Sequence, residues 1–312
     1  QDRMWQMTVL RRTAQGRLSE LFGDRTLGID EVMRRFDLYP LAVSSVDAQT
    51  DDTKLALKAY ANGVNAWLSA VNAGSRGRGA PEMWLFNHPI APWQPGDSIA
   101  ILKLMALDLT SNLSDEVLRA RTSLVLDTDR VKDILPDDPT SALAALPAYA
   151  SLVPDVPSFT PNMRLAYDPL SPIKPRGLSG ASNAWAASAA RSATGSTLLA
   201  NDPHLGLTAP SIWYLARLEL ESGGVIGGTI PGMPMVLSGR SDSVGWALTS
   251  AYVDDKDIFI EEVNPDNPAE YRGPDGWVPF RTRDSIITVK DAPAVTLNLR
   301  WTANGPVMPR GQ

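Results

Sequence analysis

Ser182 stands where the pattern of the chain changes, at Gly180-Ala181-Ser182-Asn183-Ala184-Trp185. Before it the chain is rich in proline, serine and glycine, and after it apolar residues begin to alternate with polar ones. A serine hydroxyl is a weak nucleophile unless an adjacent base takes its proton. A serine in this position more often serves as a turn or cap residue, so Ser182 is a candidate nucleophile only if its surroundings support that role.

His204 follows in the segment Asn201-Asp202-Pro203-His204 and is one of only 2 histidines in the chain. A histidine can orient or exchange protons within hydrogen-bond reach of a nucleophile. It can equally be a structural residue of a turn, and both interpretations stay open for His204. The other histidine lies in Phe86-Asn87-His88-Pro89, where nothing points to chemistry, and we interpret it as structural.

Acidic residues offer a second kind of site, at Asp254 and Asp257. Two carboxylates three positions apart, with a backbone carbonyl between them, can share a hard cation such as Ca²⁺. An ordinary solvated acidic turn would give the same pattern. The chain has no cysteine, which excludes disulfides and thiolate chemistry. Its net charge of -6 does not favour nucleic acid or an anionic membrane as a partner. The chain contains no run of the roughly 20 apolar residues that a helix needs to span a bilayer.

Two halves of different periodicity must position these residues. Residues 1–150 carry helical spacing. One amphipathic helix is predicted from Met4 to Phe22, another from Asp51 to Val71, and a strongly apolar one from Ile99 to Leu107 after a turn at Trp93–Asp97; a further helix begins at Ser114. Residues 151–181 read as a proline-rich linker. The chain opens and closes abruptly, and we expect both ends to be cuts through a longer protein.

Residues 182–312 carry period-two alternation, which is typical of strands. The expected strands are Asn183–Ala187, Ser211–Glu221, Val225–Ile230, Met235–Ser238, Val244–Ser250, Ile258–Val263, Ser285–Val289 and Val295–Trp301. Helices followed by antiparallel strands predict an α+β fold.

Several short motifs, taken in order, resemble the penicillin acylase family. In the first half these are Gln1–Met7, Arg11-Arg12, Gly16-Arg17-Leu18 and Glu20–Gly23; in the second half they are Ser182–Trp185, Ala193–Gly206, Pro231–Pro234, Gly239, Gly245–Thr249 and Asp254–Phe259. Each motif is short, but the combination is specific and covers nearly all of the chain. The family belongs to the N-terminal-nucleophile hydrolases. The resemblance implies an αββα four-layer sandwich of two mostly antiparallel sheets.

The resemblance also implies that a precursor cuts itself between Ala181 and Ser182, with residues 151–181 serving as linker or spacer. The physical reason is direct: the new amine of Ser182 titrates near ~8 and can act as base, whereas the amide it replaces cannot. By resemblance, His204 orients that amine, and an oxyanion donor falls at Ser250 and Ala251. A second donor, an Asn side chain, lies past residue 312 in the family pattern, so we expect this stretch alone to be poorly active or inactive.

Further expectations follow from the same resemblance. The acyl pocket is assigned to Met105, Leu205 and Ser238, and the last two replace aromatic residues of some relatives. A structural Ca²⁺ is assigned to Glu116, Asp254, the Lys256 carbonyl and Asp257. The mature protein is expected to be an α/β heterodimer cut from one zymogen, periplasmic or secreted, without organic cofactor.

The expected function is hydrolysis of an acyl–amide bond in penicillin-like or other N-acyl substrates through Ser182. N-Acyl-homoserine lactones or other fatty acyl amides are the alternative substrates. A second alternative is a non-catalytic scaffold or binding module that keeps the sequence pattern.

Overall fold

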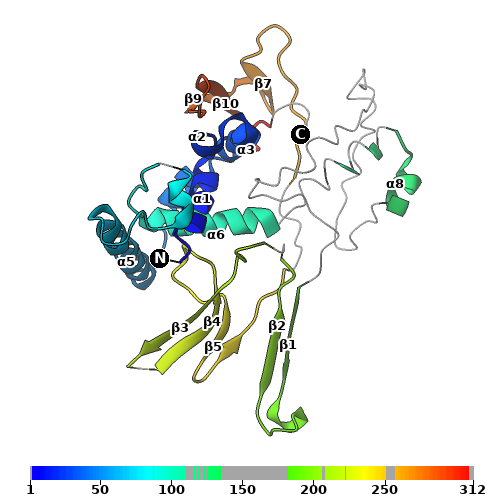
Figure 1. Cartoon of the computed structure of the whole chain (residues 1–312). Coiled ribbons are helices and arrows are strands. Elements are labelled where there is room, and N and C mark those ends of the chain that lie inside the picture. Colours follow the sequence, from blue (N-terminus) through cyan, green and yellow to red (C-terminus); the bar gives the residue numbers. More distant parts are fainter. Residues whose placement is uncertain are drawn as a thin grey trace. The chain divides into compact units, whose positions relative to one another are not determined.

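The computed structural model describes residues 2–86, 88–109, 116, 118–119, 122–123, 125–134, 182–205, 208–221, 223–250 and 257–308. Its α-helices are α1 (Met4–Gln15), α2 (Ser19–Phe22), α3 (Leu27–Phe36), α4 (Leu38–Ser44), α5 (Asp51–Asn72), α6 (Pro95–Leu109) and α8 (Thr128–Ile134), with 3₁₀ turns at Gly23–Thr26, Pro81–Trp84 and Ala189–Arg191 (Figure 1). None of the described helices is long and apolar enough to cross a bilayer. The predicted linker and most of the helix expected from Ser114 lie outside the described residues.

Strands occupy the second half: β1 (Asn183–Ala187), β2 (Leu198–Asp202), β3 (Tyr214–Leu220), β4 (Gly223–Thr229), β5 (Ser238–Ser241), β6 (Gly245–Trp246), β7 (Glu270–Gly273), β8 (Gly276–Pro279), β9 (Arg281–Ile287) and β10 (Val295–Trp301). They form the sheets β1-β2, β3-β4-β5-β6, β7-β8 and β10-β9. The pairings from β1 to β8 are antiparallel. The α+β prediction is therefore confirmed at this level.

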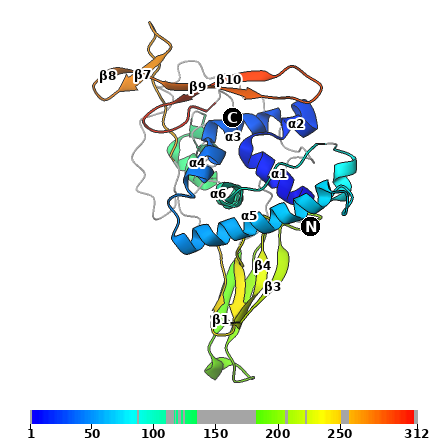
Figure 2. The ribbon, with the colours of Figure 1, turned by 90° about the vertical axis from the view of Figure 1, so that its left-hand side faces the viewer.

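The chain forms two compact units. One comprises Gln1–Ala106, Tyr167–Ala251 and Arg283–Leu299, and the other comprises Leu107–Ala166, Tyr252–Thr282 and Arg300–Gln312. In the first unit the strands β1 to β5 extend from one side of α5 and α6 (Figures 1 and 2). Buried Met7, Ala61, Ile101 and Ile230 pack together with Trp93 and Met233, so α1, α5, α6 and the segment after β4 share one core.

The single helix expected over residues 4–22 is wrong, because Gly16 ends α1 in the left-handed conformation at φ 61°. A Cβ at this position would lie 2.7 Å from the Asp30 carbonyl oxygen, so no side chain fits without movement. The Asp30 carboxylate then accepts the Leu18 and Ser19 backbone N–H groups at 2.8 and 2.7 Å, which satisfies the start of α2. The chain therefore turns between α1 and α2 around α3.

The apolar helix α6 begins earlier than predicted, at Pro95. Proline suits the first turn of a helix, where its missing N–H would be unpaired anyway. Asp97 therefore lies inside the first turn, and its carboxylate reaches back to accept the Gln94 N–H at 2.7 Å. The same carboxylate is buried against Arg11, 3.3 Å away, and accepts the Tyr39 hydroxyl at 2.8 Å.

β1 and β10 have the expected bounds, and Val295–Trp301 alternates apolar and polar residues without interruption. The strand expected at 235–238 is wrong, since β5 begins only at Ser238. Ile258–Val263 forms no strand; its only paired residue is Val263, in an isolated bridge with Tyr271, and next to it the Glu262 carbonyl oxygen accepts the Arg272 N–H at 2.8 Å. The short hairpin β7–β8 was not expected, and directly after its turn β8 begins at Gly276, whose φ of 137° favours glycine.

Candidate active site

The hairpin β1–β2 determines where the candidate nucleophile lies. Its register places Asn183 opposite Asp202 and Ala187 opposite Leu198. Ser182 directly precedes Asn183, and Pro203 and His204 directly follow Asp202. The two predicted catalytic side chains therefore belong to the same open end of one hairpin, although 22 positions separate their numbers (204 − 182).

Asn201 joins this hairpin to the segment after β6. Its side-chain amide donates to the Asn183 carbonyl oxygen and to the Leu248 carbonyl oxygen, both at 2.9 Å. Its amide oxygen accepts the Leu248 N–H at 3.3 Å. An asparagine offers two donors and an acceptor in one plane, and all three functions are used here. Asn201 therefore holds residue 248 beside the start of β1.

Ser182 is half-buried, and its carbonyl oxygen accepts the Thr249 hydroxyl at 2.8 Å. Ser250, one of the predicted oxyanion residues, is the next residue along the chain and is also half-buried. The structure thus brings Ser182 and the segment 248–250 together. Ala251, the other predicted donor, lies outside the described residues.

His204 points its Nε2 atom at the Asp202 carboxylate, with a separation of 3.0 Å. The side chains are 43% and 66% exposed, so water screens this pair and its contribution to stability is small. A carboxylate on one side of an imidazole does, however, fix the ring orientation. Asp202 is thus a candidate orienting residue for His204.

The predicted acyl-pocket residues come from three elements. Met105 lies on α6 and packs against the core cluster of Trp93 and Ile101. Leu205 follows His204, with its N–H bonded to the Pro203 carbonyl oxygen at 3.0 Å. Ser238 opens β5, opposite Gly228 of β4. The common role of these three side chains in one pocket stays a prediction.

The predicted cation site is only partly described. Glu116 accepts the Ile258 N–H through Oε2 at 3.2 Å, so its carboxylate lies beside the residue that follows Asp257. Asp257 is exposed, whereas Asp254 and Lys256 lie outside the described residues. Among the residues that are described, no three acidic or histidine side chains gather as a metal-binding group.

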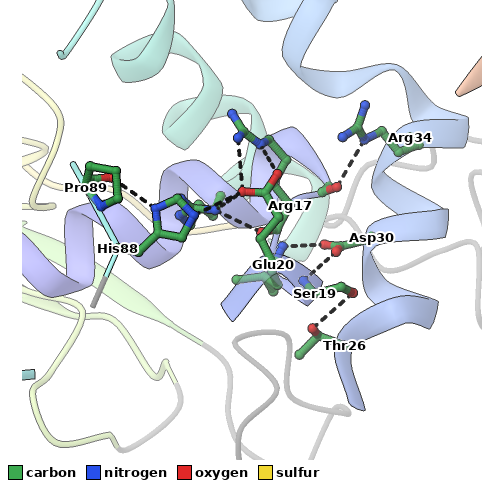
Figure 3. A network of polar contacts seen from close by, with 11 residues as sticks. Arg17, Ser19, Glu20, Thr26, Asp30, Arg34, His88 and Pro89 are labelled. Carbon is green, nitrogen blue, oxygen red and sulfur yellow. Dashed lines mark hydrogen bonds and ion pairs between the residues drawn. The ribbon is translucent and has the colours of Figure 1, made fainter. Parts of the chain in front are cut away.

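The motifs of the first half build a polar network (Figure 3). Glu20 accepts Arg12 Nη1 at 2.6 Å and Arg17 Nε at 2.6 Å. Burial by itself raises the pKa of Glu20, but the hydrogen bonds from Arg17 and Arg12 outweigh it, and its pKa lies below the ordinary value. Burial also lowers the pKa of Arg12. The motif therefore secures the turn between α1 and α2.

His88 belongs to the same network. Its Nδ1 lies 3.2 Å from the Pro89 carbonyl oxygen, and Arg12 Nη2 approaches both ring nitrogens at 3.1 and 3.3 Å (Figure 3). If His88 carries its proton on Nδ1 and donates it to the Pro89 carbonyl oxygen, Nε2 is left to accept from Arg12. These contacts give His88 a structural place in the turn.

Asn201, Asp202 and Thr249 lie within the family-like motifs of the sequence but are not among its predicted site residues. The role of Asn201 depends on Leu248, 47 positions along the chain, and that of Thr249 depends on Ser182, 67 positions before it. A polar Asn-Asp pair at the end of a strand is the one sequence signal that could have pointed to them.

Known proteins resemble this chain in sequence. Penicillin acylases and related acylases recur among the relatives: the acyl-homoserine lactone acylase QuiP of Pseudomonas fluorescens is 30% identical over 98% of this chain and 38% of its own length. The penicillin acylase 2 proenzyme of a Pseudomonas species is 27% identical over 99% and 39%, and the penicillin G acylase of Escherichia coli is 24% identical over 100% and 42%. The chain thus spans about two fifths of these relatives.

A solved structure of a thermostable penicillin G acylase from Alcaligenes faecalis matches with a TM-score of 0.34 and 29% identity, over 36% of this chain and 20% of that one. So low a TM-score does not establish a common arrangement. The sequence model of penicillin amidase, in contrast, matches residues 1–312, the whole chain. The chain belongs to the penicillin amidase family.

Proposed function

We propose that the chain is part of a self-processing amidohydrolase that cleaves an acyl–amide bond through Ser182. The observation that carries this is the placement of Ser182 at the open end of β1–β2, held through its carbonyl by Thr249 and flanked by His204, in a chain of this family. The relatives' names divide between acyl-homoserine lactone acylase and penicillin acylase. An N-acyl amide is the bond common to both.

Cleavage between Ala181 and Ser182 would free the Ser182 amine. In the mature form this amine takes the proton of the Ser182 hydroxyl, through a water, as Oγ attacks the substrate carbonyl carbon. The proton passes to the departing amine as the C–N bond breaks, and an acyl ester on Oγ remains. Water then attacks the ester with the same amine as base, which releases the carboxylic acid and restores the serine.

The backbone near Ser250 and Ala251 is proposed to donate to the oxyanion formed in both steps. Its support is the pair of links that Asn201 and Thr249 make between the start of β1 and residues 248–249. His204, oriented by Asp202, is proposed to hold the Ser182 amine and hydroxyl in register. Met105, Leu205 and Ser238 are proposed to line the acyl pocket.

A structural Ca²⁺ is proposed at Glu116, Asp254, the Lys256 carbonyl and Asp257. Carboxylate and carbonyl oxygens are the ligands that Ca²⁺ prefers, and the contact of Glu116 with the Ile258 N–H places one such group beside Asp257. The ion would stabilise the fold.

The whole protein is proposed to be an α/β heterodimer with the four-layer αββα fold, in the periplasm or secreted, with residues 1–150 in the first chain, 151–181 as linker or spacer and residues from 182 onward in the catalytic chain.

A substrate panel tests the function. The full-length protein is incubated with N-octanoyl-homoserine lactone, benzylpenicillin and a neutral N-octanoyl amide, and the released amine is quantified. We expect release from the aliphatic substrates in the wild type and none in Ser182→Ala. A protein that stays uncut and releases no amine from any of the three would contradict the proposal and favour a binding module.

A further inference from the structure

A cavity of about 410 Å³ lies within the first unit, among the beginning of α1, α5, β3 and the segment 229–236. In Figure 2, α5 crosses the ends of β3 and β4 close to the start of the chain. Cavities of roughly 300–1,000 Å³ are the usual size for small-molecule sites. Its walls share no residue with the predicted catalytic, acyl-pocket or cation sites.

Most of this wall is aliphatic. Met7, Leu218, Ile230, Met233, Met235 and Val236 contribute to it. Ala56 and Ala216 line it as well, and their small side chains leave the space between α5 and β3 open. An apolar wall of this kind favours an aliphatic chain, because each methylene removed from water adds to binding.

A cation stands at one edge of the cavity. Arg3 donates through Nη1 to the Ser211 carbonyl oxygen at 2.6 Å and to Gln6 Oε1 at 2.9 Å, and through Nη2 to the Trp213 carbonyl oxygen at 3.4 Å. All of these acceptors are neutral. Among the residues that the structure describes, Arg3 has no carboxylate partner, so its charge is not neutralised by an ion pair.

A phenol provides a second donor to the cavity. The Tyr60 hydroxyl oxygen accepts the Gly232 N–H at 3.0 Å, and the described part of the chain offers no acceptor for the hydroxyl proton. Burial raises the pKa of Tyr60, while the Gly232 hydrogen bond lowers it less, so the phenol keeps its proton at neutral pH. The Tyr60 side chain is half-buried, and a ligand oxygen in the cavity would accept its hydroxyl proton.

One group opposes an anion. Asp2 also lines the cavity, and its carboxylate accepts the Tyr214 hydroxyl at 3.3 Å. Asp2 is exposed, so water screens its charge, whereas Arg3 is half-buried. The balance at the edge of the cavity therefore favours a negatively charged head group over a positive one.

We propose that this cavity binds an aliphatic monocarboxylate, with the chain against the apolar wall and the carboxylate between Arg3 and the Tyr60 hydroxyl. The site goes beyond the proposed hydrolysis and does not require it. A released acyl acid has the same chemistry as this ligand, so the site would retain a product of the proposed reaction.

Calorimetric titration of the full-length protein with octanoate, octanol and octylamine tests the site. We expect one-site binding of octanoate, tighter than that of octanol and much tighter than that of octylamine. Lengthening the acid from hexanoate to octanoate should tighten the dissociation constant about four-fold per methylene. Equal binding of octanoate and octylamine would overturn the proposal.

Variants locate the binding. Ala56→Phe, on the exposed side of α5, should fill the cavity and weaken octanoate binding at least ten-fold, and Ala216→Phe should do so from β3. Leu55→Phe is the matched control, because Leu55 is 67% exposed and does not line the cavity; it should bind as the wild type does. Arg3→Gln should weaken octanoate binding about ten-fold or more and octanol less than two-fold, since a charged hydrogen bond is lost.

Asp2→Asn supplies a test of sign: it should tighten octanoate binding and weaken that of octylamine. Octanoate could instead occupy the Ser182 end of β1–β2 as a hydrolysis product. In that case Leu205→Trp would lose octanoate binding, while Ala56→Phe and Ala216→Phe would bind it as the wild type does. This outcome would overturn the proposal. Because titration needs no turnover, an inactive protein that still binds octanoate at this cavity would sink the proposed hydrolysis alone.

Discussion

The Thr249 hydroxyl donates to the carbonyl oxygen of Ser182 at 2.8 Å, across 67 positions of the chain. This bond lies on the C-terminal side of Ser182, whereas the predicted cut removes the peptide bond on its N-terminal side. The anchor therefore does not depend on whether the chain has been cut, and the new amine would form beside a residue that is already held.

Processing is the first prediction. The full-length precursor should yield a mature chain that begins at Ser182, and Ser182→Ala should remain uncut because the attacking oxygen is gone. Intact mass and N-terminal sequencing of both proteins measure this. Ser196→Ala, an exposed serine in the turn of the same hairpin, should be processed normally. A mature N-terminus at any other residue would disprove the assignment.

Asn201 carries the second prediction. Asn201→Asp keeps the size but replaces the donating amide by a carboxylate oxygen, which would face the carbonyl oxygens of Asn183 and Leu248. We expect a loss of about 1–3 kcal/mol in the free energy of unfolding and much slower processing. Urea denaturation and the time course of cleavage measure the two effects. An Asn201→Asp precursor that is stable and cut at the wild-type rate would remove Asn201 from the site.

His204 separates chemistry from scaffolding. His204→Ala in the mature enzyme should lower kcat strongly, on the order of 10²-fold, because a small misplacement near reacting atoms has large effects. Its melting temperature should stay close to that of the wild type, since the side chain is 43% exposed. His204→Gln should retain more activity because its amide reaches similar partners. A lower melting temperature with normal kcat would instead make His204 structural.

Glu20 gives a prediction for pH. Because the folded-state pKa of Glu20 is lowered, its contribution to stability is present above the unfolded pKa of about 4.3 and is lost as pH falls through the folded value. Glu20→Gln should cost on the order of 3 kcal/mol near pH 7, because it leaves Arg12 buried without an anion. The difference between wild type and variant should shrink below pH 4.

Glu31→Gln is the matched control for Glu20. Glu31 pairs with Arg35 one turn away on α3, a helix-surface pair for which about 0.3–0.5 kcal/mol is usual. Chemical denaturation at a series of pH values compares the two variants. Equal losses in both, or a difference that does not change with pH, would contradict the role of Glu20.

Calcium is tested by melting curves with calcium and with a chelator. If the proposed ion binds, wild-type protein should melt at a higher temperature in calcium, because a ligand that binds only the folded state stabilises it. Asp257→Ala and Glu116→Ala should reduce that difference, while Asp266→Ala, outside the proposed ligand set, should preserve it. Identical wild-type curves in both conditions would exclude the assignment.

Local patterns were sufficient to predict much of this molecule. β10 follows from alternation, β1 has the expected bounds, and α5 follows from helical spacing that begins at Asp51 as expected. The break at Gly16 could not be read from the apolar pattern, because it comes from a left-handed glycine cap and not from the spacing of apolar residues. β2 was not predicted from the sequence, because Leu198–Asp202 becomes a strand through its pairing with β1.

Only part of the candidate site could be predicted from the sequence. Ser182 and His204 could be singled out because each carries reactive atoms and lies in a recognisable motif. The links made by Asn201 and Thr249 depend on which carbonyl groups the register brings opposite them, and a residue list does not contain that information.

The chain turns between α1 and α3, and the bonds that hold this corner bear on the order in which the protein folds. Its bonds from Leu18, Ser19 and Arg34 span only 12, 11 and 18 positions, whereas Arg34 reaches Ser285 across 251. Short loops close at low entropic cost and early, and long ones late. We therefore expect this corner to be assembled on the ribosome before β9 has been synthesised, and β9 to dock onto it afterwards.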